Sequence, residues 1–173
     1  MASRTRNAGR TTFLSPETTA FLSRRLSELG GLLLSVCGLA LTVAVLGYDS
    51  SDPSWNHSVT RDSLNPLGGT GAVVADAIVQ SIGGGGVLPG IVLMVWGWRT
   101  GTHRGLGRLW IRVAALTVLL LLASIALAGA PAWTGWPVRS GLGGVTGGIL
   151  LADFGALAAG AVPQWALALA SGV

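Results

Sequence analysis

"LGGLLLSVCGLALTVAVLG", residues 29–47, is a run of nineteen residues without a charged side chain. As an α-helix that rises about 1.5 Å per residue, it can nearly cross a hydrocarbon core about 30 Å thick. Hydrophobic residues make up 50% of the 173-residue chain and charged residues only 10%, which is far from the composition of a soluble domain. The run therefore predicts a transmembrane helix in an integral membrane protein.

Three further stretches of low charge follow the first run. They predict additional spans at about 70–98, 112–130 and 148–173. The last stretch differs from the others because it is rich in Ala and Gly and contains Asp153, Pro163 and Gln164. The predicted fold class is all-α, an integral membrane bundle of four transmembrane helices.

The segment ahead of the first span, residues 1–28, is rich in arginine. Ser15 suits the N-cap of a helix, with Pro16 at the first helical position and Glu17 in the first turn. Apolar residues then recur at helical spacing. We predict a short interfacial helix that leads into the first span.

The arginines are distributed unevenly along the chain. Nine lie ahead of the first span or between the second and third spans, against two in the segments 48–69 and 131–147. The positive-inside rule then places both termini and the loop 99–111 in the cytoplasm, and the other two loops outside. The arginines that carry this prediction nearest the membrane are Arg24, Arg25, Arg99, Arg104, Arg108 and Arg112. Contact with anionic lipid or DNA is the alternative use of these residues.

Two heptapeptides near the starts of the second and fourth spans are alike. "TGAVVAD" covers residues 70–76 and "GGILLAD" covers residues 147–153; each has Gly second, apolar residues fourth and fifth, and Ala-Asp at its end. The match predicts two helix hairpins arranged as a parallel repeat. A general bias toward Ala and Gly is the competing explanation.

The heptapeptides end in Asp76 and Asp153, and an ionisable side chain at membrane depth is a candidate functional group. The competing interpretation places both carboxylates in the first turns of their helices, where the helix dipole favours a negative charge. If the carboxylates are functional, the alternative function for the chain is a small four-span transporter or channel subunit. Each interpretation predicts a different environment for the two side chains.

Glycines are abundant in the predicted spans, and small residues four apart let helices approach closely in lipid. The candidates for helix packing are Gly86, Gly90, Gly143, Gly144, Gly147 and Gly148. The run "GGGG" at 83–86, followed by Pro89, is also compatible with a kink or a broken helix.

Several kinds of chemistry are excluded by residue types. The chain has no lysine, which excludes a Walker A phosphate loop and a Schiff-base lysine. Its single cysteine, Cys37, can form no internal disulfide. An enzyme that uses Asp52 and His57 remains as a minor alternative, although their spacing matches no metal-ligand pattern. We expect no catalytic residues, no bound metal and no cofactor in this chain.

The loop after the first span, "GYDSSDPSWNHS" at 47–58, is polar and carries turn-forming residues. Asp-Pro starts a turn, Ser and Asn side chains can bond to loop backbone, and Tyr and Trp suit the membrane interface. The loop therefore reads as a shaped connection between two spans. Its candidate recognition residues are Tyr48, Asp52, Pro53, Ser54, Trp55 and Asn56.

Four segments together carry a family resemblance: "RRLSELGGLLLSVCGLALTVAVLGYDSSDPSWN", "NPLGGTGAVVAD", "LPGIVLMVWGWR" and "GGVTGGILLAD". In this order the chain resembles the N-terminal four-span membrane domain of the FtsK/SpoIIIE family of bacterial DNA translocases. The most specific element is the outer loop that contains Tyr48 and Asp52 to Asn56. The resemblance covers nearly the whole chain from Arg24 onward.

The resemblance implies a role in chromosome segregation and cell division. Members of the family anchor an ATP-driven, hexameric DNA motor at the division septum. This chain would be the anchor and septum-targeting part in the bacterial inner membrane, and the native protein would continue beyond Val173 into the motor. Its implied partners are membrane lipid, other division proteins and further copies of itself, as a hexamer. DNA, ATP and Mg²⁺ would belong to the motor alone.

Overall fold

The structure is a computed structural model that describes residues 15–54, 62–132 and 134–159. These residues form helices joined by turns and loops, with no β-strand among them. In chain order the helical elements are α1 (Pro16–Leu46), α2 (Gly68–Ile82), the 3₁₀ turn η1 (Gly83–Gly86), α3 (Val87–Gly101), α4 (Leu109–Ala128) and α5 (Gly144–Ala158).

Within the described ranges, three helical segments are long and apolar enough to cross a membrane: Pro16–Leu46, Gly68–Gly101 and Leu109–Ala128. A shorter apolar helix, Gly144–Ala158, follows them. This arrangement confirms the all-α membrane bundle that the sequence predicts. The end of the fourth predicted span, from residue 160, lies outside the described residues.

Helix α1 begins at Pro16, as the sequence predicts. Ser15 caps it, because the Ser15 hydroxyl accepts a hydrogen bond from the Thr18 N–H at 3.2 Å. The segment 16–28, predicted to form a short interfacial helix, runs without a break into the first span. Residues 16–46 form one continuous helix of 31 residues. The physical reason is that Pro16 occupies the first helical position, where proline is tolerated, and that no proline follows it up to residue 46.

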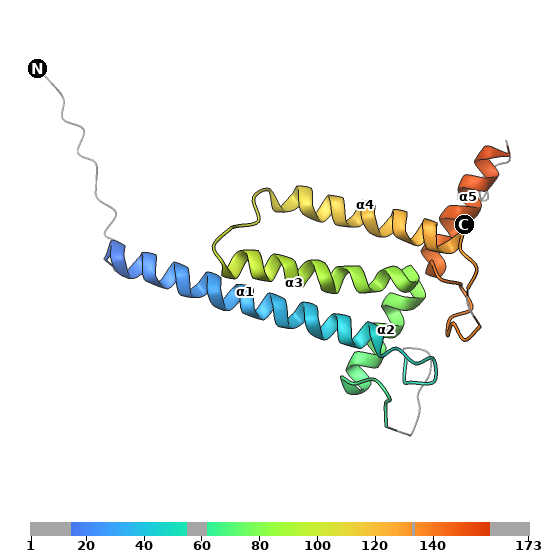
Figure 1. Cartoon of the computed structure of the whole chain (residues 1–173), viewed down its shortest axis with the longest axis horizontal. Coiled ribbons are helices and arrows are strands. Elements are labelled where there is room, and N and C mark those ends of the chain that lie inside the picture. Colours follow the sequence, from blue (N-terminus) through green and yellow to red (C-terminus); the bar gives the residue numbers. More distant parts are fainter. Residues whose placement is uncertain (1–14, 55–61, 133, 160–173) are drawn as a thin grey trace, which may run out of the picture.

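The second predicted span is divided into two helices. α2 ends at Ile82, the four glycines of η1 follow, and α3 begins at Val87, at an angle to α2 (Figure 1). Gly83 adopts φ +64°, which an L side chain rarely tolerates, and its successor Gly84 donates its N–H to Leu142 O at 2.9 Å. The glycine run is therefore a true break in the helix, stabilised by a contact with the chain ahead of α5.

The helices α1 and α3 pack closely through their glycines and run side by side (Figure 1). A Cβ added to Gly38 would lie 2.6 Å from Gly90 O, and one added to Gly90 would lie 2.8 Å from Gly38 O. Gly31 and Gly97 form a second pair of this kind, with corresponding distances of 2.6 and 2.5 Å. Backbone contact along one face holds the two helices together.

The second close pair is α4 with α5. A Cβ on Gly143 would meet Ala128 N at 2.7 Å, and one on Gly147 would meet Ser124 C at 2.7 Å. Gly148 is a predicted packing residue, but nothing lies within 4 Å of a Cβ built there. The reason is helical geometry, since a residue adjacent to Gly147 points about 100° away from the α4 contact.

In the part of the chain that the structure describes, few apolar residues are buried, as expected where lipid covers the outside. They are Ala44, Val45, Ala72, Ala75, Val79 and Leu142. They lie where the end of α1, the helix α2 and the chain ahead of α5 meet. This small core sits beside the loops and positions the polar groups described next.

Candidate functional site at the two-loop end

Two connections gather at the same end of the bundle, which we call the two-loop end (Figure 1). The first loop joins α1 to α2 and is described at residues 47–54 and 62–67. The second loop joins α4 to α5 and spans residues 129–143, of which residue 133 is not described. At the opposite end, the connection between α3 and α4 carries arginines, and we call it the arginine end.

Asp52 ties the two halves of the first loop together. Its carboxylate accepts hydrogen bonds from Ser63 Oγ at 2.9 Å, Leu64 N at 2.7 Å and Asn65 N at 2.8 Å. The residue is only 4% exposed. Burial raises the pKa of its carboxyl, but the hydrogen bonds from Leu64, Ser63 and Asn65 outweigh burial and hold the pKa below its usual value.

Asn65 continues this network into the helices. Its side-chain Nδ2 donates to Ala44 O at 2.8 Å and to Gly47 O at 3.1 Å, which satisfies carbonyls left open at the end of α1. Its Oδ1 accepts from Leu67 N at 3.1 Å, just before α2 begins. Asp52 and Asn65 with the groups they bind form what we call the loop clasp.

Asn65 was not among the residues predicted from the sequence. The signal that could have found it is the pair Asn65-Pro66, because an Asn side chain ahead of Pro favours a turn and bonds to backbone two residues on. Asp52, in contrast, was predicted as a recognition residue. The structure places it inside the loop, where its oxygens are engaged by the loop itself.

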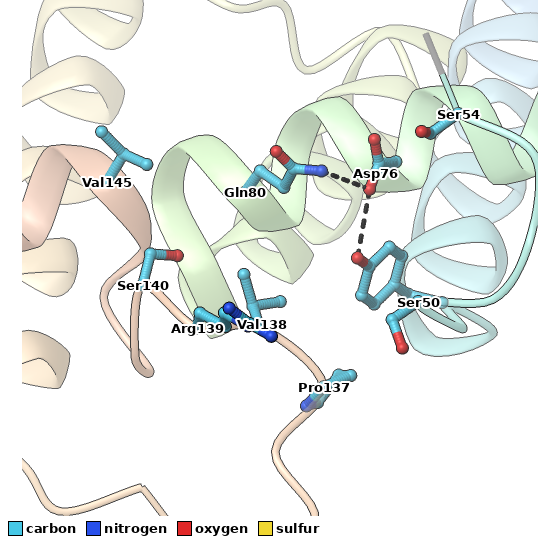
Figure 2. Close-up of a pocket in the computed structure, with 10 residues that line it drawn as sticks. Ser50, Ser54, Asp76, Gln80, Pro137, Val138, Arg139, Ser140 and Val145 are labelled. Atoms are coloured by element: carbon cyan, nitrogen blue, oxygen red, sulfur yellow. Dashed lines mark hydrogen bonds between the residues drawn. The ribbon is translucent and has the colours of Figure 1, made fainter. Parts of the chain in front are cut away.

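The carboxylate of Asp76 lies in a polar pocket between the two loops. Its Oδ1 accepts a hydrogen bond from Tyr48 Oη at 3.1 Å and from Gln80 Nε2 at 2.7 Å (Figure 2). Asp76 lies eight residues after Gly68, the start of α2, so the expectation that the helix dipole stabilises it in the first turn is wrong. Its hydrogen-bond partners are instead Tyr48 in the first loop and Gln80, which lies one turn further along α2.

The pocket has a volume of about 330 Å³. Its walls come from the first loop, α2, the second loop and the start of α5, and are formed by Tyr48, Ser50, Ser54, Asp76, Gln80, Pro137, Val138, Arg139, Ser140 and Val145. Figure 2 shows Arg139 on the second loop, across the pocket from Ser54. The hydroxyl of Ser140 is buried and has no hydrogen-bond partner among the described residues.

Tyr48 reports on the environment of this pocket. Burial, together with the neighbouring Asp76 carboxylate, raises the pKa of the phenol to about 12. Tyr48 therefore stays protonated at physiological pH, and its hydroxyl donates a hydrogen bond to the Asp76 carboxylate. The sequence predicts Tyr48 at the membrane interface and Asp76 at a helix start. In the structure a hydrogen bond links the two side chains.

The other predicted site residues are dispersed or fall outside the described part. Ser54 lines the pocket, whereas Asp153 is buried on α5 and does not line it. Asp153 lies nine residues after Gly144, the start of α5, so the dipole interpretation fails there too. Trp55, Asn56 and His57 lie outside the described residues. Among the described residues, no group of His, Cys, Asp and Glu side chains could hold a metal ion.

Comparison with known proteins settles the family. Residues 23–173 match the family model described as the 4TM region of DNA translocase FtsK/SpoIIIE. The chain belongs to the FtsK/SpoIIIE family. The matched part is the membrane region of FtsK/SpoIIIE proteins, which confirms the resemblance seen in the sequence.

Individual FtsK relatives agree with this assignment. DNA translocase FtsK of Azospirillum brasilense is 36% identical over 141 residues, which cover 80% of this chain and 22% of the relative. DNA translocase FtsK of Rhizobium meliloti is 37% identical over 150 residues, covering 84% of this chain and 16% of the relative. The chain therefore spans about a fifth of the length of these FtsK proteins. No solved structure matches it.

Proposed function

We propose that this chain is the membrane anchor of a DNA translocase and that its two-loop end helps to place the translocase at the division septum. The apolar helices and the family membership support the anchoring part. One observation carries the targeting part: the loop clasp gives the first loop a defined shape beside the pocket that contains Asp76 and Arg139. A loop that is already ordered binds a partner with a smaller entropic cost.

The proposed topology follows from the arginines. Both termini and the arginine end lie in the cytoplasm, and the two-loop end faces the opposite side of the inner membrane. The recognition surface would then consist of the pocket rim, with exposed Arg139 on one side and Ser54 on the other. A partner would be another membrane or extracytoplasmic division protein.

Localisation of the chain fused to a fluorescent protein at its N-terminus tests this proposal. We expect septal enrichment for the unaltered chain and for Asp62→Asn, an exposed first-loop residue used as the control. We expect a loss of enrichment for Arg139→Glu, with membrane insertion unchanged. If the unaltered chain spreads evenly over the membrane, or if Arg139→Glu localises normally, targeting by this surface is refuted and only the anchoring role stands.

Assembly into a hexamer is a further part of the proposal, since the relatives are translocases and the helices expose apolar surface over much of their length. Crosslinking in native membranes measures it directly. Products up to six copies support assembly through the membrane domain. A product limited to the monomer would place the assembly surface elsewhere in the protein.

The alternative of a transporter or channel subunit is less well supported. It requires Asp76 and Asp153 to share a path, whereas Asp76 is engaged by Tyr48 and Gln80 and Asp153 lies outside the pocket. Substitution of each aspartate by Asn separates the two functions. Loss of activity in both variants, with normal insertion and localisation, would favour the transport function over the anchor.

A further inference from the structure

The helices α3 and α4 leave a groove between them at the arginine end. α3 packs on α1 through Gly90, Gly97 and Gly101, so the opposite face of α3 is turned away from α1. At 100° per residue this opposite face carries Val92, Trp96 and Arg99. α4 packs mainly against α5 and does not close over this face of α3.

The groove has a volume of about 240 Å³. On the α3 side it is lined by Val92 and Trp96. On the α4 side it is lined by Arg112, Ala115, Leu116 and Leu119, which follow one helix face at intervals of three and four residues. The groove is thus apolar along its length, with a guanidinium at the end where α4 begins.

Two arginines lie at the arginine end of the groove: Arg112 is part of its wall, and Arg99 lies three residues after Trp96 on α3. Arg112 is held there because its Nε donates to Leu106 O. Arg99 follows Trp96 on the same face of α3, and its Nε is buried without a hydrogen-bond partner among the described residues. The Arg112 guanidinium therefore borders an apolar groove, and the buried Nε of Arg99, one helical turn past Trp96, lacks a partner in the described part of the chain; both cations suit an anionic ligand.

The chain itself supplies few anions near this site. The sequence from residue 77 to residue 152 contains no Asp or Glu. At the arginine end the nearest described carboxylate is Glu28 on α1, where it pairs with Arg25 at 2.6 Å and with His103 at 3.4 Å. The charge that balances Arg99 and Arg112 must come from outside these helices.

We propose that this groove binds an anionic phospholipid of the leaflet at the arginine end. The phosphate lies between Arg99 and Arg112, Trp96 lies at the headgroup level, and one acyl chain follows Val92, Leu116 and Leu119. An acyl chain matches the apolar wall, and the headgroup supplies the anion that the two arginines require. A helix from a second copy would match the wall, but it would bring further arginines, and the carboxylate it carries at this level, Glu28, is already paired with Arg25 and His103.

Native mass spectrometry of the chain in detergent tests the site, with phosphatidylglycerol compared with phosphatidylcholine of the same acyl chains. We expect preferential binding of one phosphatidylglycerol. The double variant Arg99→Gln/Arg112→Gln should bind it about 30-fold more weakly, because each basic group near an anionic surface contributes about 1 kcal/mol, or about fivefold. Ala115→Trp fills the groove without changing charge and should also abolish the preferential binding.

The matched control is Arg24→Gln/Arg104→Gln, which removes the same charge from the same end of the bundle outside the groove. Its effect should stay below about threefold, because distant exposed charges are screened. Equal losses in the two double variants, or normal binding by Ala115→Trp, would overturn the proposal. So would a crosslink between Leu119→Cys side chains of two copies in native membranes, in a Cys37→Ala background, because a second copy would then occupy the groove.

Discussion

At the scale of single residues, the side chains of this domain act mainly as internal connectors. Asp52 accepts three hydrogen bonds from the far side of its own loop, and Asn65 passes the connection on to α1 and α2. Asp52, a candidate recognition residue in the sequence, is therefore buried within the first loop and stabilises its shape. In the proposed function, the residues that contact a partner are exposed ones at the pocket rim, such as Arg139.

Replacing Asp52 by Asn should loosen the first loop while leaving the helices in place. The amide presents one NH₂ group where a carboxylate oxygen accepted hydrogen bonds, so at least one donor among Ser63, Leu64 and Asn65 loses its acceptor. Hydrogen exchange at the Leu64 and Asn65 amides should accelerate about fivefold or more, as expected for a loss of about 1 kcal/mol. Asp62→Asn is the control, and unchanged exchange in Asp52→Asn would show that the clasp is not what orders the loop.

The pocket predicts an unusual titration for the single tyrosine of the chain. Because the pKa of Tyr48 is raised to about 12 in the folded protein, the folded state should lose stability as the pH rises from about 10 through 12. Ultraviolet absorbance of the phenolate measures this pKa without interference from another tyrosine. In Asp76→Asn the pKa should fall but stay above its ordinary value, since burial remains. An ordinary pKa in the folded, unaltered chain would mean that Tyr48 is neither buried nor bonded to Asp76.

At the scale of the helices, glycine spacing decides which faces meet. Gly31→Ala should weaken the α1–α3 contact, because its Cβ would lie 2.6 Å from Gly97 O. The expected loss is about 1–3 kcal/mol from overpacking. Gly30→Ala is a neighbour with nothing within 4 Å and should be neutral or stabilising by about 0.5–1 kcal/mol. Unfolding in detergent measures both, and equal stabilities of the two variants would contradict the packing.

The sequence predicts the all-α membrane bundle because the length and the apolar composition of a span are local properties. It also identified Gly86, Gly90, Gly143 and Gly147 as contact residues. It could not separate the two uses of "GGGG", because the choice between packing and a break depends on the hydrogen bond from Gly84 to the distant Leu142. For the same reason the site was only partly predictable: Tyr48 and Asp76 were found singly, but their pairing depends on the angle of α2.

At the scale of the whole molecule, the domain has two chemically different ends. The two-loop end carries carboxylates and hydrogen-bonded loops, and the arginine end carries guanidinium groups and exposed tryptophans such as Trp98 and Trp110. This polarity is the physical basis of the proposed orientation. It also assigns the two proposed surfaces to opposite faces of the membrane, partner recognition at one and lipid binding at the other.

Cysteine labelling in intact cells tests this orientation. In a Cys37→Ala background, Ser54→Cys should react with a membrane-impermeant maleimide, and Thr102→Cys should react only after the membrane is opened. Both residues lie outside the apolar part of the bundle, so burial in lipid does not explain a difference between them. The reverse pattern would place the arginine end outside the cell.

The uninterrupted length of α1 has a mechanical consequence. Thirty-one residues make a rod of about 46 Å, roughly 15 Å longer than the hydrocarbon core. Because backbone contacts at Gly31 and Gly38 hold this helix against α3, we expect the two helices to tilt together when the bilayer thins or thickens. We expect a change in bilayer thickness to be felt as a change in this shared tilt, which displaces the start of α1 at Pro16 most because it lies farthest from the contacts with α3.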